Sequence, residues 1–325
     1  MMSSPNNDDS RLQPCTHATL RAYLELMRLP NVFTAMADVA MGYLFIQQAD
    51  WRFDLWRDSW TLGLLLATSS LLYIAGMVLN DVFDRTIDRH ERPERPIPSG
   101  RVSVAAARRS GFALLVLGVV FASNAAVERG QWRPAGVALL LAGAILLYDA
   151  WLKRTPLGPP AMGACRMLNV FLGMSAVAVP LTAAHWLVAG GIGVYIVGVT
   201  WFARNEATAS RRVPLALATL VMLAGIGMLA WFPRWSAHVV PLLQREPQRW
   251  YMLTGALGLL IGWRCLRAIA EPTRERVQMA VVHGLLSLVV FDAVACYAVR
   301  GVFWASMILL LLAPTMLLGR RVRMT

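Results

Sequence analysis

The sequence predicts an all-α membrane protein, a polytopic bundle of nine to ten transmembrane helices. Of its 325 residues 57% are hydrophobic and only 15% are charged, and the mean hydropathy is +0.51. Soluble domains carry about 25% charged residues. The charges are also clustered and leave apolar runs of about 20 residues, the length a helix needs to cross the bilayer core. Because lipid cannot hydrogen-bond an open backbone, such runs must be helical.

Hydropathy windows of about 19 residues place the spans along the chain. The candidates are 31–48, 60–80, 108–126, 134–150, 165–183, 186–203, 214–232, 250–268, 279–299 and 302–319. The first contains Asp38, and the last follows its neighbour after only two residues, so the count is nine or ten. The longest outer loop, 233–249, is compatible with a short interfacial helix.

A polar tail, residues 1–22, precedes one transmembrane domain, residues 23–325. The tail has no apolar segment, so we expect no cleavable signal peptide. The four cysteines and five histidines are dispersed, and their spacing predicts no zinc or iron site.

The basic residues predict the orientation of the spans. With the N-terminus placed in the cytoplasm, 23 of the 31 arginine and lysine residues fall on the cytoplasmic side and 8 on the other. Cytoplasmic loops carry such an excess, so we expect both termini and the loops after the second, fourth, sixth and eighth spans to be cytoplasmic. This bias accounts for most of the net charge of +12, and no nucleic-acid partner is predicted.

An acidic cluster ends the second span. Asn80, Asp84 and Asp88 are four residues apart, so in a continuing helix they share one face, and Asp81 lies beside them. Like charges at this spacing repel unless they share a cation. Carboxylate and amide oxygens suit Mg²⁺, so these four residues are the predicted metal ligands. The alternative is that the acids merely pair with neighbouring arginines such as Arg85, Arg89 and Arg92.

The segment after the acids is rich in arginine and proline, RHERPERPIPSG over residues 89–100. Arginine binds phosphate through a two-pronged fork, and proline restricts the loop that carries it. Arg92 and Arg95 are therefore candidate ligands of a diphosphate beside the metal.

NDxxDxxxD followed by RPxRPxPSG resembles the first aspartate-rich motif of the UbiA superfamily of intramembrane prenyltransferases. The resemblance implies a helical bundle, usually of nine spans, around a cavity open to lipid. Weaker matches follow in order over roughly residues 25–300. They are RLPN at 28–31, YDAWLKR at 148–154 and Arg-x-x-Asn-x-x-x-Gly at 166–173.

These matches imply roles for single residues. Lys153 is placed on the diphosphate, and Asn31, Tyr148, Arg166 and Asn169 join the candidate substrate-binding residues. The residues alone leave other roles open, since Asn31 and Asn169 could cap helices and Lys153 could be an orienting charge.

The sequence departs from the family at its second aspartate-rich motif. The corresponding stretch, TWFARNEA over residues 200–207, contains one acid, Glu206, with Asn205 beside it. Both are candidate substrate-binding residues, and Glu206 is a candidate ligand of a second metal, which would then have one protein carboxylate. This stretch resembles the EboC-like branch of the superfamily.

The predicted activity is Mg²⁺-dependent transfer of a prenyl group from an isoprenoid diphosphate to a lipophilic acceptor in the bilayer, with Asp84, Asp88 and Lys153 as catalytic residues. The alternative is a non-catalytic protein that binds an isoprenoid or polar lipid for a transport or biosynthetic complex. A plain multi-span transporter would leave the acidic cluster unexplained. The prenyl chain length, the acceptor and the oligomeric state are not set by the sequence.

Overall fold

The computed structural model describes residues 21–47, 51–204, 212–236 and 241–319, and every regular element in them is helical. The α-helices after residue 31 are α2 (Val32–Phe45), α3 (Arg57–Phe83), α4 (Arg85–Glu91), α5 (Val104–Arg129), α6 (Arg133–Ala150), α7 (Gly158–Met174), α8 (Ala183–Arg204), α9 (Arg212–Trp231), α10 (Pro241–Arg245), α11 (Pro247–Ala270), α12 (Arg274–Arg300), α13 (Val302–Leu309) and α14 (Leu312–Gly319). Short 3₁₀ helices are η2 (Leu29–Asn31), η3 (Leu152–Arg154) and η4 (Phe232–Trp235).

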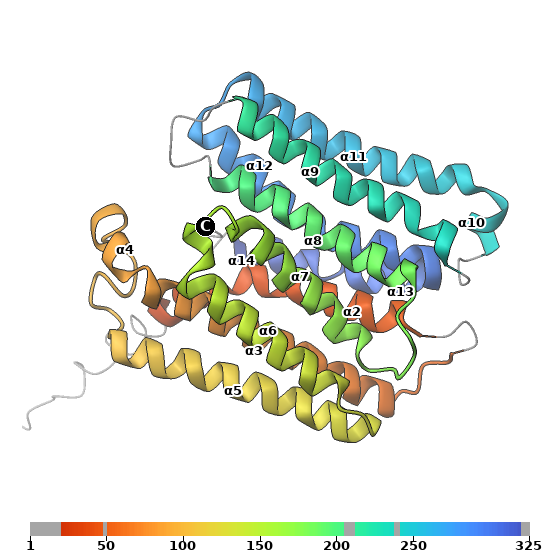
Figure 1. The fold of residues 1–325 in the computed structure, drawn as a ribbon, viewed down its shortest axis with the longest axis horizontal. Coiled ribbons are helices and arrows are strands. Elements are labelled where there is room, and N and C mark those ends of the chain that lie inside the picture. Colours follow the sequence, from red (N-terminus) through yellow and green to blue (C-terminus); the bar gives the residue numbers. More distant parts are fainter. Residues whose placement is uncertain (1–20, 48–50, 205–211, 237–240, 320–325) are drawn as a thin grey trace, which may run out of the picture.

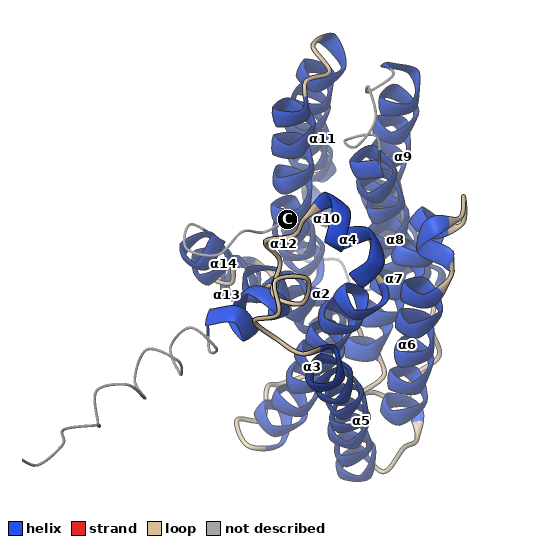
Figure 2. Cartoon of the chain, turned by 90° about the vertical axis from the view of Figure 1, so that its left-hand side faces the viewer, coloured by secondary structure: helices blue, strands red, loops and turns tan. Residues whose placement is uncertain are grey.

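The longer helices pack side by side in a closed ring. In chain order α2, α3, α5, α6, α7, α8, α9, α11 and α12 each contact the next, and α12 returns to α2. The helices lie roughly parallel along the long axis (Figure 1), and the view from the end near α4 shows α13 and α14 outside the ring beside α12 and α2 (Figure 2). The predicted polytopic all-α bundle is confirmed.

Seven helices in the described residues are long and apolar enough to cross a membrane: α3, α5, α6, α8, α9 with η4, α11 and α12. With 14 and 17 residues, α2 and α7 are shorter, and they pack among the long helices. The chain is thus an integral multi-pass membrane protein, as predicted.

Two predicted spans differ from the structure. The apolar stretch 302–319 is not one helix but two, α13 and α14, because Pro314 has no N–H to donate to the carbonyl of Leu310. The span expected at 165–183 begins earlier, at Gly158, since Pro159 and Pro160 are favourable in the first turn of a helix. The helix expected within 233–249 is present as α10, and its location at a membrane interface stays a prediction.

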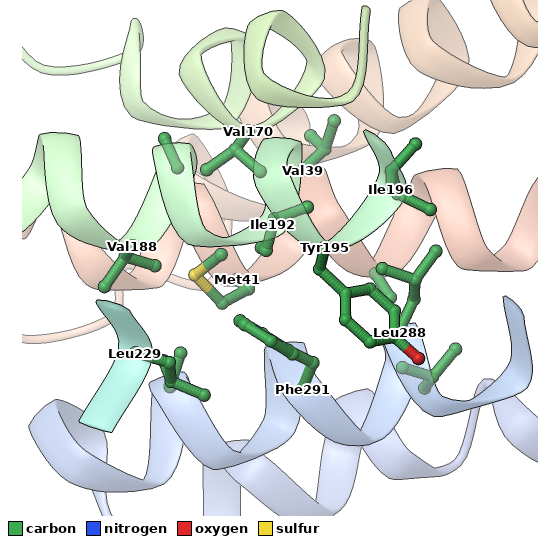
Figure 3. Close-up of a cluster of buried hydrophobic side chains, with 14 of the residues drawn as sticks. Val39, Met41, Val170, Val188, Ile192, Tyr195, Ile196, Leu229, Leu288 and Phe291 are labelled. Carbon is green, nitrogen blue, oxygen red and sulfur yellow. The ribbon is translucent and has the colours of Figure 1, made fainter. Parts of the chain in front are cut away.

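The apolar core lies where α2, α7, α8 and α12 meet. Figure 3 shows Met41 of α2, Ile192 and Tyr195 of α8 and Phe291 of α12 facing one another. The ring centroids of Tyr195 and Phe291 are 5.6 Å apart, and the Tyr195 hydroxyl donates to the carbonyl of Gly284 at 2.9 Å. The phenol is therefore buried with its polar end satisfied, as burial of tyrosine requires.

A polar cluster ties α2, α3 and α5 together at the end of the bundle opposite the acidic motif. Asp58 accepts hydrogen bonds from the Tyr43 hydroxyl at 2.6 Å and from Arg129 at 2.5 Å, and Arg129 also donates to Thr61 at 2.8 Å. The cluster pairs a buried carboxylate with a guanidinium, so neither charge is left uncompensated.

Helices α2 and α7 approach so closely that their contact requires glycine. A Cβ at Gly173 would meet the carbonyl oxygen of Val39, and one at Gly42 would meet that of Val170, both well inside van der Waals contact. Small residues allow such backbone contact between membrane helices.

We therefore expect Gly173→Ala to lower the free energy of unfolding by about 1–3 kcal/mol, because α2 and α7 must separate. The measurement is thermal unfolding of the purified protein in mild detergent. Gly143→Ala is the matched control, since nothing lies within 4 Å of a Cβ there. Equal unfolding temperatures for the two variants would contradict the prediction.

Candidate active site

The acidic motif, the arginine loop and the end of α6 gather at the end of the bundle where α4 lies (Figure 1). A cavity of about 340 Å³ opens there between α2, α3, α6, α7, α8 and α12. Its polar lining includes Arg28, Asn31, Ser69, Tyr73, Arg92, Tyr148, Asp149, Arg166 and Asn169. The remaining lining is mostly apolar and includes Leu72, Leu141, Ile145, Met162, Ile196 and Leu285. An apolar pocket with a few convergent polar groups is the usual form of a ligand site.

Lys153 joins α6 to the acidic motif. The turn η3 directs its ammonium to Asn80 Oδ1 and Asp84 Oδ2, both at 2.9 Å. Arg154 donates to the other Asp84 oxygen at 3.1 Å. The oxygens of Asn80 and Asp84 therefore converge on one positive charge.

Arg95 pairs with the other two acids of the motif, Asp81 and Asp88. Its Nη1 lies 2.7 Å from Asp88 and 3.4 Å from Asp81, and Arg28 lies 3.2 Å from Asp81. Arg28 has a left-handed backbone, with φ 45° and ψ 48°, which is uncommon outside glycine. The prolyl turn after it and its pairing with Asp81 fix that conformation, which places a guanidinium in the cavity wall.

The structure thus divides the motif differently from the predicted single face. The backbone departs from helical angles at Asp84, with φ −87° and ψ 0°, although the N–H groups of Asp84 and Asp88 still donate to the carbonyls four residues earlier. Asp84 is paired with Lys153, whereas Asp88 is paired with Arg95. The arginines that pair with the acids are Arg28, Arg95 and Arg154, which lie outside α3 and α4. The sequence-based alternative named Arg85, Arg89 and Arg92 because it considered only close neighbours in the chain.

The donor set fits a hard divalent cation. Mg²⁺ in proteins is usually held by one or two carboxylates, with substrate phosphate and water completing its shell. Asn80 and Asp84 offer oxygens that already converge on a cationic centre, the Lys153 ammonium. Over the described ranges, no three acidic, histidine or cysteine side chains form a metal cluster, so a metal here would draw on the substrate for further ligands.

Arg166 and Asn169 belong to a buried network that reaches across to α2. Arg166 donates to Asp38 at 2.8 Å and to the Thr34 hydroxyl at 2.9 Å, and Asn169 donates to Asp38 at 3.1 Å. The fully buried carboxyl group of Asp292 on α12 lies near Asp38 and Arg166, and neither of its oxygens has a hydrogen-bond partner within the described residues.

Of the predicted substrate-binding residues, Asn31, Arg92, Tyr148, Arg166 and Asn169 line the cavity, whereas Arg95 is held by the acids beside it. Asn205 and Glu206 lie outside the described residues.

The site residues that were not predicted include Asp149 and the network partner Asp292. Both are acids within apolar spans. Acids are rare at such positions, and this signal could have identified them.

The family model that describes the UbiA prenyltransferase family matches residues 39–289. A digeranylgeranylglyceryl phosphate synthase of Sulfolobus acidocaldarius is 34% identical over 131 residues, which is 40% of this chain and 42% of that protein. The match therefore spans less than half of that relative's length.

Solved structures share the fold. A UbiA homologue from Aeropyrum pernix K1 superposes with a TM-score of 0.59 at 16% identity, covering 81% of this chain and 96% of that one. A UbiA homologue from Archaeoglobus fulgidus bound to GPP and Mg²⁺ gives 0.58 at 13% identity, covering 82% and 99%.

Proposed function

Because this chain belongs to the UbiA prenyltransferase family, we propose that it transfers a prenyl group from an isoprenoid diphosphate to a lipophilic acceptor inside the membrane. One observation supports this most. The Lys153 ammonium contacts the oxygens of Asn80 and Asp84, and two further basic side chains, Arg28 and Arg92, line the neighbouring, mostly apolar cavity. Such a site holds an anionic head and a hydrocarbon tail at once.

Several polar residues of the site then have distinct roles. Arg92 and Arg28 bind the diphosphate from the cavity wall, and Lys153 binds it from η3. Asn80 and Asp84 would hold Mg²⁺, which would neutralise negative charge on the leaving diphosphate. Asp81 and Asp88 position Arg28 and Arg95. Asn205 and Glu206 remain candidate ligands of a second cation.

The residues of this chain assist the departure of the diphosphate. The C1–O bond of the substrate breaks, its electron pair goes to the diphosphate, and fixed positive charges stabilise that anion. Tyr73 and Tyr148 line the cavity, and their ring faces can stabilise the allylic cation left at C1. The apolar wall excludes water that would quench this cation before the acceptor attacks.

The relatives' names suggest which acceptor to offer first. Geranylgeranylglyceryl phosphate carries one prenyl group fewer than the compound in those names, and it combines an apolar chain with a free hydroxyl. We also propose, from the distribution of arginine, that the end of the bundle containing α4 faces the cytoplasm, where soluble diphosphates are available.

The test is diphosphate release by the purified, lipid-reconstituted protein, offered allylic diphosphates of increasing length together with that acceptor. We expect release that stops when a chelator removes Mg²⁺ and returns when Mg²⁺ is added back. Tight binding of diphosphates that stay intact, across a broad acceptor set, would instead favour the non-catalytic lipid-binding alternative.

A further inference from the structure

Asp149 is a buried carboxylate that the proposed diphosphate seat does not use. It lies near the C-terminal end of α6, lines the cavity and is 2% exposed. Its Oδ2 has no hydrogen-bond partner within the described part of the chain. Burying a carboxylate oxygen without a partner is unfavourable, so an unpartnered oxygen on a residue that lines a cavity indicates a ligand that supplies the partner.

In the sequence, Asp149 lies between residues of the apolar cavity wall and Lys153, which contacts the acidic motif. Leu141 and Ile145 lie two turns and one turn before it on the same helix face, and they are part of the apolar wall. Lys153 follows four residues later, in η3, and its ammonium contacts Asp84 of the acidic motif. A prenyl diphosphate with its head at Lys153 and its tail along Ile145 therefore brings the C1–O bond past Asp149.

The groups around Asp149 leave it as the available base. The charged and titratable side chains that interact electrostatically with it are Lys153, Asp84, Asp81, Arg28, Tyr148 and Cys165. Asp84 is engaged by Lys153 and Arg154, and Asp81 by Arg28 and Arg95. Among these three carboxylates, Asp149 is the one that lines the cavity and has a buried oxygen without a hydrogen-bond partner in the described residues.

We propose that Asp149 is the general base of the transfer and that the acceptor is a lipid hydroxyl. The inference rests on the proposed function. The acceptor oxygen donates a lone pair to C1 and forms the new C–O bond. The C1–O bond to the diphosphate breaks and its electron pair leaves with the diphosphate. The hydroxyl proton moves to Asp149 Oδ2. An aromatic carbon acceptor would not donate a hydroxyl proton as it attacks.

The experiment compares wild type, Asp149→Asn and Asp149→Ala in lipid vesicles with geranylgeranyl diphosphate, Mg²⁺ and geranylgeranylglyceryl phosphate. Glu128→Gln is the matched control, because it removes an exposed carboxylate at the far end of α5. We expect both Asp149 variants to lose about 10²–10⁴-fold in turnover, the usual contribution of a general base. Added formate should restore part of the activity of Asp149→Ala, and a merely structural aspartate would show no such rescue.

The outcomes separate this inference from the proposed function. If wild type and Asp149→Asn make product at the same rate, Asp149 is not the base, while the prenyl transfer stands. Product from an aromatic acceptor, with none from the hydroxyl acceptor, would overturn the acceptor class. If wild type binds the diphosphate and leaves it intact with every acceptor, both the transfer and the role of Asp149 are wrong. Binding of geranylgeranyl thiodiphosphate, measured by calorimetry, should be unchanged in Asp149→Asn.

Discussion

Asp84→Asn is expected to reduce Mg²⁺-dependent diphosphate release by at least about 10²–10³-fold, the loss seen when one electrostatic contact to a developing charge is removed. The side chain keeps its size and one oxygen but loses the charge that Lys153 and Arg154 now balance. The fold should be retained, because Asp84 is partly exposed and ion pairs near a surface contribute about 1 kcal/mol or less.

Two measurements check this result. Diphosphate release is compared with that of wild type and of Glu128→Gln, and binding of Mn²⁺ in place of Mg²⁺ is followed by electron paramagnetic resonance. Full turnover in Asp84→Asn, with unchanged Mn²⁺ binding, would show that the metal is held elsewhere.

The bundle was predictable because span length and charge clustering are local properties of the chain. The errors in the predicted spans were local as well. Pro314 divides the last apolar stretch, a feature that a hydropathy average over about 19 residues does not resolve. The prolines at 159 and 160 moved the start of α7 for the same reason.

The structure brings several of the predicted residues together, but their pairing was not predicted. Spacing within one helix indicated that Asn80, Asp84 and Asp88 share a face, yet Asp84 is paired with Lys153 from 69 positions further along the chain. Asp88 is paired with Arg95 through a turn whose path the sequence does not specify. Asp149 belongs to the YDAWLKR segment, but the sequence predicts no role for it, because the sequence does not show which face of the helix lines the cavity. Contacts between elements depend on how the helices pack, and a period of 3.6 residues describes only one helix at a time.

The network around Arg166 supports a second large effect, on stability. Asp38 and Asp292 are both fully buried, and Arg166 is the guanidinium that compensates the Asp38 carboxylate. Removing one partner of a buried ion pair typically costs about 3–5 kcal/mol, since the other charge is left uncompensated. We therefore expect Arg166→Met to lower the unfolding temperature in mild detergent far more than Gly143→Ala does.

A double variant separates the two roles open to Arg166. Asp38→Leu combined with Arg166→Met removes both charges, and replacing a buried pair by apolar residues of similar volume is often neutral for stability. If the pair is structural, the double variant should recover most of the stability lost in Arg166→Met. If Arg166 serves chiefly to bind substrate, Arg166→Met should unfold at the wild-type temperature and lose affinity for the thiodiphosphate analogue. The cavity lining alone is compatible with either role, but the hydrogen bonds of Arg166 to Asp38 and Thr34 already engage two of its nitrogens within the protein. This geometry favours the structural role. Arg166 Cζ also lies over the Tyr73 ring, 5.6 Å from its centroid, and both residues line the cavity.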